Sequence, residues 1–280
     1  MKVRIIVDST ADVHANIKEQ LKVVPLTIHF GDTEYVDGVT ITHEEFYAKL
    51  IESDELPRTS QATPVAFGKA FEEIVTAGES AVVLTSSSEF SGTYQSAMLA
   101  AQNYPDRIYV VDTKSAAIGS GILAELALQL ADSGMDAKTI AEKLTEEREN
   151  VCLIALLDTL EYLKRGGRIS KAEAFAGGIL SIKPVIALKD GKIITLGKAR
   201  GSKQGNNLLI KEIQNTGGVD FNKPILLGYT GLSDLLLKKY EADSQELWQE
   251  GTSELNSTLI GSVIGTHAGP GAIAAAFFKK

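Results

Sequence analysis

The chain has 280 residues, a formal net charge of −8 at pH 7, 44% hydrophobic residues and 23% charged residues. This length can bury a substantial core and fits two domains or one large α/β unit. The acidic balance argues against a broad nucleic-acid surface, and no apolar run reaches the roughly 18 residues that a membrane span needs. We therefore expect neither nucleic-acid binding nor a transmembrane segment.

The first residues predict a strand rather than a secretory signal. Residues 1–8 (MKVRIIVD) lack the longer apolar core and the small-residue cleavage site of a signal peptide. The single cysteine, Cys152, lies in an apolar run, so an internal disulfide is excluded and a buried structural thiol is the simple interpretation. We expect a cytoplasmic protein.

The first half of the chain alternates β-rich and helical segments. Strands are predicted at residues 3–7, 81–85 and 108–112, with amphipathic stretches between them. A capping-box pattern from Thr42 to Glu45 predicts the start of one of the helices. Such alternation favours a mostly parallel sheet with helices on both faces.

The second half changes character near residue 158. The patterns predict helices at residues 160–164, 202–215 and 232–240, a hairpin of 183–188 and 193–196, and strands at 225–228 and 258–264, whereas 272–278 fits either type. We predict two α/β domains, residues 1–157 and 158–280, the second with a mixed sheet and helices. The cleft between them is the expected place for a ligand.

Polar residues stand directly before a predicted helix that ends near Gly78. Thr63 suits its N-cap and Pro64 its first position. The preceding Thr59, Ser60 and Gln61 lie where free backbone amides and the helix dipole favour an anion. Simple capping explains Thr63 alone, and this segment by itself does not decide between capping and an anion site.

Serines follow the predicted strand at 81–85, at the end where ligands gather in open α/β sheets. Residues 86–88 are interpreted as caps. Ser91, beside Gly92 at an expected helix start, is the better candidate for a ligand contact. At the next strand-to-helix junction Asp112 is again expected to be a cap.

A glycine-rich stretch, residues 265–271 (GTHAGPG), places His267 beside Gly269 at the expected end of an apolar strand. Glycines let the backbone approach a ligand closely, and the imidazole can donate or accept hydrogen bonds. A tight turn with a solvated histidine is the alternative. The sequence has no P-loop, dinucleotide fingerprint or nucleophile elbow, and no histidine pair with metal-ligand spacing.

Two basic segments stand out in this acidic chain. The first contains Arg165 and Arg168, and the second contains Arg200 and Lys203. Cations at solvated helix ends explain part of the pattern. A docking surface or a phosphate-facing surface is the alternative interpretation.

Five segments together resemble the DegV family across the whole chain: residues 8–12 (DSTAD), 59–61 (TSQ), 91–94 (SGTY), 160–169 (LEYLKRGGRI) and 267–271 (HAGPG). One departure is the sequence Ala62-Thr63-Pro64, where many members have Pro-Ser or Pro-Thr after the glutamine. The resemblance implies a bacterial fatty-acid-binding protein that acts in phospholipid metabolism as the carrier subunit of a fatty acid kinase. A separate ATP-binding subunit would phosphorylate the bound long-chain fatty acid.

The same resemblance implies a site in which Thr59, Ser91 and His267 surround the fatty acid carboxylate while the acyl chain enters an apolar tunnel between the domains. We expect supporting loop residues at Ser60, Gln61, Gly92, Thr93 and Gly269, and partner docking by Arg165, Arg168, Arg200 and Lys203. No catalytic residue, metal or cofactor is expected in the carrier.

Two other functions compete with the carrier. A lipid or acyl-ester hydrolase could use Ser91 and His267, but it needs an orienting carboxylate, for which Asp8 is a candidate. A regulatory module could instead sense a small anion in the same cleft.

Overall fold

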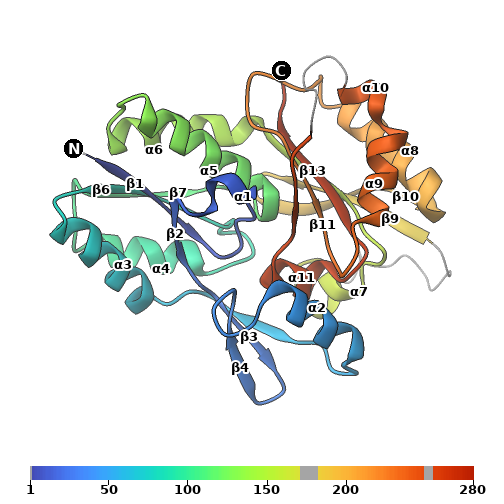
Figure 1. The fold of residues 1–280 in the computed structure, drawn as a ribbon, viewed down its shortest axis with the longest axis horizontal. Helices are drawn as coiled ribbons and strands as arrows, with labels where there is room; N and C mark the ends of the chain where they lie inside the picture. Colours follow the sequence, from blue (N-terminus) through green and yellow to red (C-terminus); the bar gives the residue numbers. More distant parts are fainter. Residues whose placement is uncertain (1, 171–181, 249–254) are drawn as a thin grey trace.

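The computed structural model describes residues 2–170, 182–248 and 255–280, and its described strands form three sheets (Figure 1). The first sheet is wholly parallel, in the order β2 (Leu21–Val24), β1 (Val3–Asp8), β6 (Ser80–Thr85) and β7 (Ile108–Asp112). The helices of this part are α1 (Ala15–Lys18), α3 (Pro64–Thr76), α4 (Thr93–Ala101), α5 (Ala117–Asp132) and α6 (Ala137–Glu147), followed by the 3₁₀ turn η1 (Arg148–Asn150).

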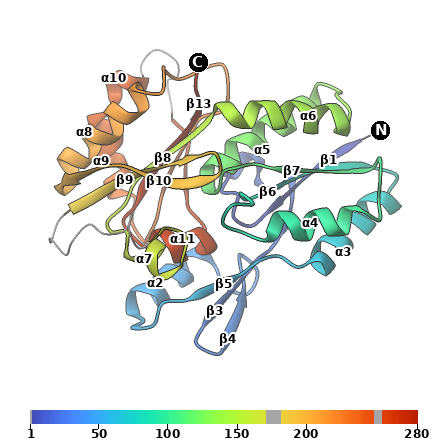
Figure 2. The same ribbon diagram turned by 180° about the vertical axis from the view of Figure 1, so that it is seen from behind.

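Helices cover both faces of the first sheet, as predicted. Along β1, Ile5 packs into the core that contains residues of α5 and α6, whereas Ile6 packs into the core that contains residues of α3 and α4. Figures 1 and 2 show these two pairs of helices on opposite sides of the sheet. Because side chains alternate along a strand and helices cover both faces of this sheet, the central strand β6 is buried along its whole length.

The second sheet is mixed, in the order β10 (Lys192–Arg200), β9 (Ile182–Lys189), β8 (Val151–Leu156), β13 (Ile273–Phe278), β11 (Leu226–Tyr229) and β12 (Ser257–Leu259). Only β11 and β12 run parallel to each other. On one face lie α8 (Gly201–Gln214), α9 (Leu235–Asp243) and α10 (Gln245–Trp248). On the other face α5 packs, so this helix is shared by the cores of both sheets.

A small third sheet projects below the other two in Figure 1 and consists of β4 (Thr33–Val36), β3 (Thr27–Phe30) and β5 (Arg58–Ser60). Near it lie α2 (His43–Glu52), α7 (Glu161–Arg165) and α11 (Ser262–Ala268). The capping box that begins α2 is formed as predicted, with Glu45 N donating to Thr42 Oγ1 and Thr42 N donating to Glu45 Oε2. Thr63 caps α3 by accepting from Ala66 N.

The predicted strand at residues 258–264 is confirmed only at its first two residues and is wrong beyond them. Strand β12 ends at Leu259, and α11 begins at Ser262. The β-branched composition of this stretch favours a strand, but Asp12 Oδ1 accepts a hydrogen bond from Gly261 N at 2.7 Å and fixes the start of a helix instead. His267 therefore lies in the last turn of α11 and not at the end of a strand.

The ambiguous segment at 272–278 is β13, which pairs with β8 and β11 and is buried along its whole length. Strand β8, on the N-terminal side of the expected boundary at 157/158, pairs within the second sheet. Strand pairing alone does not define domains, so the division into residues 1–157 and 158–280 stays a prediction. No helix in the described ranges is long and apolar enough to span a membrane.

Candidate functional site

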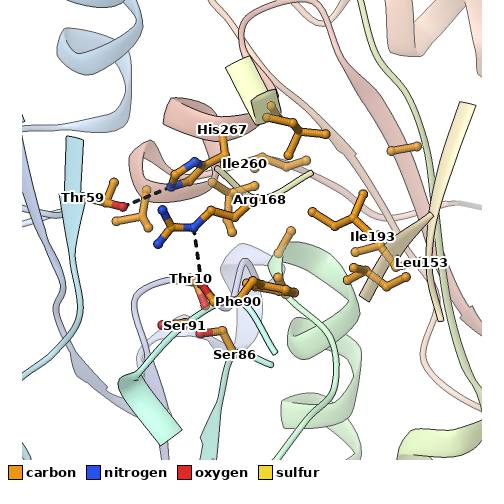
Figure 3. Close-up of a pocket in the computed structure, with 18 of the residues that line it drawn as sticks. Thr10, Thr59, Ser86, Phe90, Ser91, Leu153, Arg168, Ile193, Ile260 and His267 are labelled. Atoms are coloured by element: carbon orange, nitrogen blue, oxygen red, sulfur yellow. Dashed lines mark hydrogen bonds between the residues drawn. The ribbon is translucent and has the colours of Figure 1, made fainter. Parts of the chain in front are cut away.

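A cavity of about 400 Å³ lies between the loops of the first sheet and the face of the second sheet (Figure 3). This volume falls in the range of small-molecule sites, roughly 300–1,000 Å³. Its lining combines three sources. The loops after β1, β6 and β7 supply Thr10, Ser86, Phe90, Ser91, Gly92, Ala116 and Ala117. Segments near the third sheet supply Thr59, Ser60, Gln61, Arg168 and His267. The second sheet supplies the apolar residues Leu153, Ala155, Ile186, Leu188, Ile193 and Ala274.

Thr59 and His267 meet at one end of this cavity. Thr59 Oγ1 lies 3.0 Å from His267 Nε2, at hydrogen-bond distance. Thr59 is held on β5 by pairing with Ile28 of β3, and Asp12 fixes the start of the helix that carries His267. The contact therefore joins two segments that lie 208 positions apart in the sequence.

The His267 ring is mostly enclosed and uncharged near neutral pH. Burial, together with the positive charge of Arg168, lowers its pKa to about 4. Its Nδ1 atom is buried and has no hydrogen-bond partner within the described part of the chain. Gly166 lies against the ring, and a Cβ at that glycine would be 2.3 Å from Nδ1. The ring is thus fixed by packing while one polar atom keeps its hydrogen-bonding capacity.

Arg168 reaches into the cavity beside His267. Its Nη1 donates to Gly166 O at 2.6 Å and its Nε donates to Phe90 O at 3.3 Å, so the guanidinium links α7 to the loop after β6 (Figure 3). The side chain is half-buried, and burial lowers its pKa from the ordinary arginine value. An arginine stays charged under such conditions, and Arg168 therefore contributes a permanent positive charge to the cavity lining.

Ser91 lies in the cavity wall just before α4. Its Oγ donates to Thr93 Oγ1 at 2.9 Å and accepts from Thr93 N at 3.3 Å. Gln61 Nε2 donates to Ser96 Oγ of α4 at 2.9 Å, and Gly92 packs so closely on the Gln61 side chain that a Cβ there would lie 1.9 Å from Oε1. Gln61 and Gly92 thus hold the segment of Thr59 against the helix start that carries Ser91.

The structure brings most of the predicted head-group residues together. Thr59, Ser60, Gln61, Ser91, Gly92 and His267 all line the cavity. Thr93 lies behind Ser91 and is fully buried. Gly269 also stands behind the lining, where it ends α11 with φ of +72° and packs against the Tyr162 ring.

The four basic residues expected at a docking surface lie in different environments. Arg168 lines the cavity, whereas Arg165 is exposed and pairs with Glu161, its Nε lying 2.7 Å from Oε1. Arg200 precedes α8 and Lys203 lies in its first turn, both exposed. Across residues 2–170, 182–248 and 255–280, no hydrogen bond or ion pair joins Arg200 or Lys203 to the cavity residues.

Sequence reasoning missed the polar groups that Asp8 arranges. The Asp8 carboxylate accepts from Thr10 N and Oγ1 and from Ser86 N, which places Thr10 and Ser86 in the cavity wall. Burial raises the pKa of Asp8. The DSTAD segment was the available signal, because a buried aspartate followed by a threonine commonly forms such a turn.

The interpretation of residues 86–88 as helix caps is wrong. Ser87 Oγ donates to Gly191 O at 2.8 Å across to the turn between β9 and β10, and Ser88 Oγ donates to Asp112 Oδ2 at 2.6 Å. Asp112 in turn accepts from Lys114 N, so it stabilises the loop after β7, while the N-cap of α5 is Ala116. The side chains of Ser87 and Ser88 therefore connect the loop after β6 to segments that are distant in the sequence.

The residues of a hydrolase are not connected. Ser91 Oγ donates to Thr93, His267 bonds to Thr59, and Asp8 bonds to Thr10 and Ser86. Within the described ranges no hydrogen bond links any two of Ser91, His267 and Asp8. The described residues also contain no group of three or more His, Cys, Asp or Glu side chains that could hold a metal ion.

Comparison with known proteins identifies the family and the fold of this chain. The family model described as "Uncharacterised protein, DegV family" matches residues 2–280. A DegV domain-containing protein of Caldanaerobacter subterraneus is 36% identical over 100% of this chain and 99% of its own length. A structure described as fatty acid binding of a DegV family protein from Thermus thermophilus has a TM-score of 0.88 and 31% identity, covering 100% of both chains.

The fold extends to more distant relatives. The Streptococcus pneumoniae fatty acid kinase B3 protein, loaded with linoleic acid, has a TM-score of 0.86 at 23% identity over 100% of both chains. This likeness shows the shared fold. The whole-chain family match and the 36% identical relative show that the chain belongs to the DegV family.

Proposed function

We propose that this member of the DegV family binds a long-chain fatty acid in the cavity between its two large sheets and presents the carboxylate to a separate ATP-dependent kinase subunit. In this proposal Thr59, Ser91 and His267 surround the carboxylate, and the acyl chain lies along the second sheet. The carrier itself is cytoplasmic and does not catalyse the reaction.

The observation that carries the proposal is the division of one cavity into a polar end and an apolar wall. The wall from the second sheet consists of alanine, leucine and isoleucine side chains without a polar group among them: Leu153, Ala155, Ile186, Leu188, Ile193 and Ala274. Burial of hydrocarbon contributes about 0.8 kcal/mol for each methylene group, so a long acyl chain gains most of its affinity along this wall.

The polar end has donors suited to a carboxylate. A carboxylate removed from water needs charge-assisted hydrogen bonds, and the hydroxyls of Thr59 and Ser91 together with the Arg168 guanidinium supply donors and charge. Neutral His267 contributes one N–H. A fatty acid, with one charge at the end of a hydrocarbon chain, matches this distribution better than a small anion does.

The position of the polar end supports presentation to a partner. A second hollow, open to the surface, is lined by Ser88, Glu89, Phe90, Ser91, Gly92, Gln95, Gly167 and Arg168. It shares Phe90, Ser91, Gly92 and Arg168 with the cavity, so the expected carboxylate position lies next to the surface. The kinase role itself follows from the family resemblance of the motifs. Arg165, Arg200 and Lys203 remain proposed docking residues, with ATP and metal supplied by the partner.

Mass spectrometry of an organic extract from the purified protein tests the binding step. We expect intact free fatty acids in about equimolar amount, and less of them in a Thr59→Val, Ser91→Ala double variant that keeps the wild-type melting temperature. A second assay adds the ATP-dependent subunit and measures acyl phosphate. Extracts without fatty acid, or acyl-ester hydrolysis that Ser91→Ala abolishes, would contradict the proposal.

A further inference from the structure

The strands of the second sheet place three large apolar side chains in one row across the cavity wall. Ile193 of β10 pairs with Leu188 of β9, and the register of β9 with β8, in which Ala187 pairs with Ile154, puts Leu153 next to Leu188. All three line the cavity. Side chains in one row of a sheet point to the same face, so these three form a continuous ridge, which we call the stop row.

The neighbouring row on the same face is smaller. Ala155 pairs with Ile186 on one side and with Ala274 on the other, and all three also line the cavity. Two alanines here leave space along the middle of the sheet, whereas the stop row fills it. The cavity is therefore open along the Ala155 row and obstructed one row further on.

The stop row lies away from the polar end. Figure 3 shows Leu153 and Ile193 on the opposite side of the cavity from Thr59 and His267. An acyl chain whose carboxylate is held at Thr59 would point its terminal methyl group towards this row. Behind it, Leu153 belongs to the core that α5 shares with both sheets.

Two contacts keep the stop row in place. A Cβ on Gly119 of α5 would lie 3.2 Å from Leu153 Cβ, so the helix backbone packs directly against Leu153 and leaves it little room to move. At the other end of the row, the turn between β9 and β10 is held to the first sheet, because Ser87 Oγ donates to Gly191 O and Lys192 Nζ lies 3.5 Å from Glu89 Oε2. The row is thus fixed from both sides.

We infer that Leu153, Leu188 and Ile193 set the maximum length of the acyl chain that this protein binds. The inference rests on the proposed function, since it assumes that the cavity ligand is a fatty acid held by its carboxylate at Thr59 and His267. It assigns the residues that determine specificity at the methyl end, where hydrocarbon meets a fixed wall and a longer chain has no space.

The test uses delipidated protein offered a mixture of straight-chain saturated fatty acids of increasing length, with the bound acids identified by mass spectrometry. Ile193→Ala removes three carbon atoms from the edge of the row, and Leu153→Ala removes three from its centre. Because the surroundings of a truncated core side chain relax only partly, each change should raise the longest bound acid by about two carbons. Ile193→Phe should lower it.

The matched control is Ile194→Ala, which removes the same atoms from the same strand at a position that alternates to the opposite face and is not among the described residues that line the cavity. Melting temperatures of all variants identify any loss of folding, and Ile193→Ala at the sheet edge keeps the test valid if Leu153→Ala is unstable. A wild-type protein that binds no fatty acid would refute the proposed function. Fatty acids bound with an unchanged length limit in every variant, or an equal shift in Ile194→Ala, would refute the stop row alone.

Discussion

The two walls of the cavity differ because one is built from loops and the other from a sheet. The wall from the first sheet consists of strand ends and helix starts, where backbone groups are unpaired and polar side chains such as Thr10 and Ser91 gather. In the second sheet strand pairing satisfies the backbone of Ala155 and Ile186, and only apolar side chains face the cavity. One ligand with a charged end and a hydrocarbon tail fits both walls.

The largest expected effect reverses the charge at the polar end of the cavity, where Thr59, Arg168 and His267 lie. Arg168→Glu replaces the guanidinium beside His267 with a carboxylate, so a bound fatty acid loses a charge-assisted partner and meets a like charge. We expect at least about 3 kcal/mol, or roughly a hundredfold, weaker binding in a fluorescent fatty-acid displacement assay. Arg165→Glu is the control, because this exposed arginine lies on the adjacent helix outside the cavity lining. Equal losses in both variants would show that general surface charge, and not the cavity, governs binding.

The polar end of the cavity should also titrate, because His267 lies there, whereas the six apolar residues of the second sheet have no ionisable group. His267 has a pKa of about 4 in the folded protein, and an unfolded histidine has a pKa of roughly 6.5. Between these values the unfolded chain binds more protons, so this side chain makes the ligand-free protein less stable as the pH falls from about 6.5 to about 4. The full effect is about 3 kcal/mol, because one pKa unit corresponds to roughly 1.4 kcal/mol.

The measurement is the difference in free energy of unfolding between the wild type and His267→Gln, by urea denaturation of delipidated protein across this pH range. The buried carboxyl groups, including Asp8 with its raised pKa, contribute to both proteins and cancel in the difference. A difference that stays constant with pH would mean that His267 is not held neutral. Nuclear magnetic resonance titration of the four histidines gives an independent check.

Two neighbouring threonines should have different roles, Thr59 in ligand binding and Thr63 in capping helix α3, and substitution of each should have a smaller effect. Thr59→Val keeps the side-chain shape and removes the hydroxyl at the carboxylate position, for which we expect about 1 kcal/mol, or roughly fivefold, weaker binding. Thr63→Val removes the N-cap of α3, so about 1 kcal/mol of stability should be lost with affinity unchanged. Calorimetric titration and thermal melts of both variants measure the two quantities. The same change of affinity in both would indicate that the segment acts as one structural unit.

Local patterns in the sequence predicted the parts of the fold that short-range chemistry determines. The predicted strands β1, β6 and β7, the capping box at Thr42 and the Thr63 cap depend on neighbouring residues and are confirmed, whereas β2 and the third sheet were not predicted. Helix α11 could not be predicted in this way, because its start is fixed by Asp12, which lies 249 positions away from Gly261. The helix also decides where His267 points.

The site was predictable to a similar extent. Family motifs pointed to Thr59, Ser91 and His267, which the fold brings to one cavity. Arg168 was assigned to a docking surface because two basic segments stand out in an acidic chain, but it lines the cavity, where its Nε donates a long-range hydrogen bond to Phe90 O. The resemblance implied an apolar tunnel, but no motif identified the residues of its wall. Its alanines and leucines acquire a role only through the strand register.

The smallest expected effect concerns the contact that joins the two walls. Gly191 and Gly134 both have left-handed backbones, with φ of +78° and +86°, so alanine at either position costs about 1–2 kcal/mol of backbone strain. A Cβ at Gly134 would meet nothing within 4 Å, whereas one at Gly191 would lie 2.5 Å from Ser87 Oγ. Gly191→Ala must therefore also displace Ser87 from its hydrogen bond to this turn.

We expect Gly191→Ala to lower the free energy of unfolding by roughly 0.5–1 kcal/mol more than Gly134→Ala does, which is the contribution of one hydrogen bond. Urea denaturation of the two variants gives the difference, and adding Ser87→Ala to each should abolish it. Equal losses in the single variants would mean that the turn does not rest on the loop after β6. Leu188 and Ile193 of the stop row could then move together with the β9–β10 hairpin. The two walls of the cavity would have no fixed connection near the terminal methyl group of the bound fatty acid.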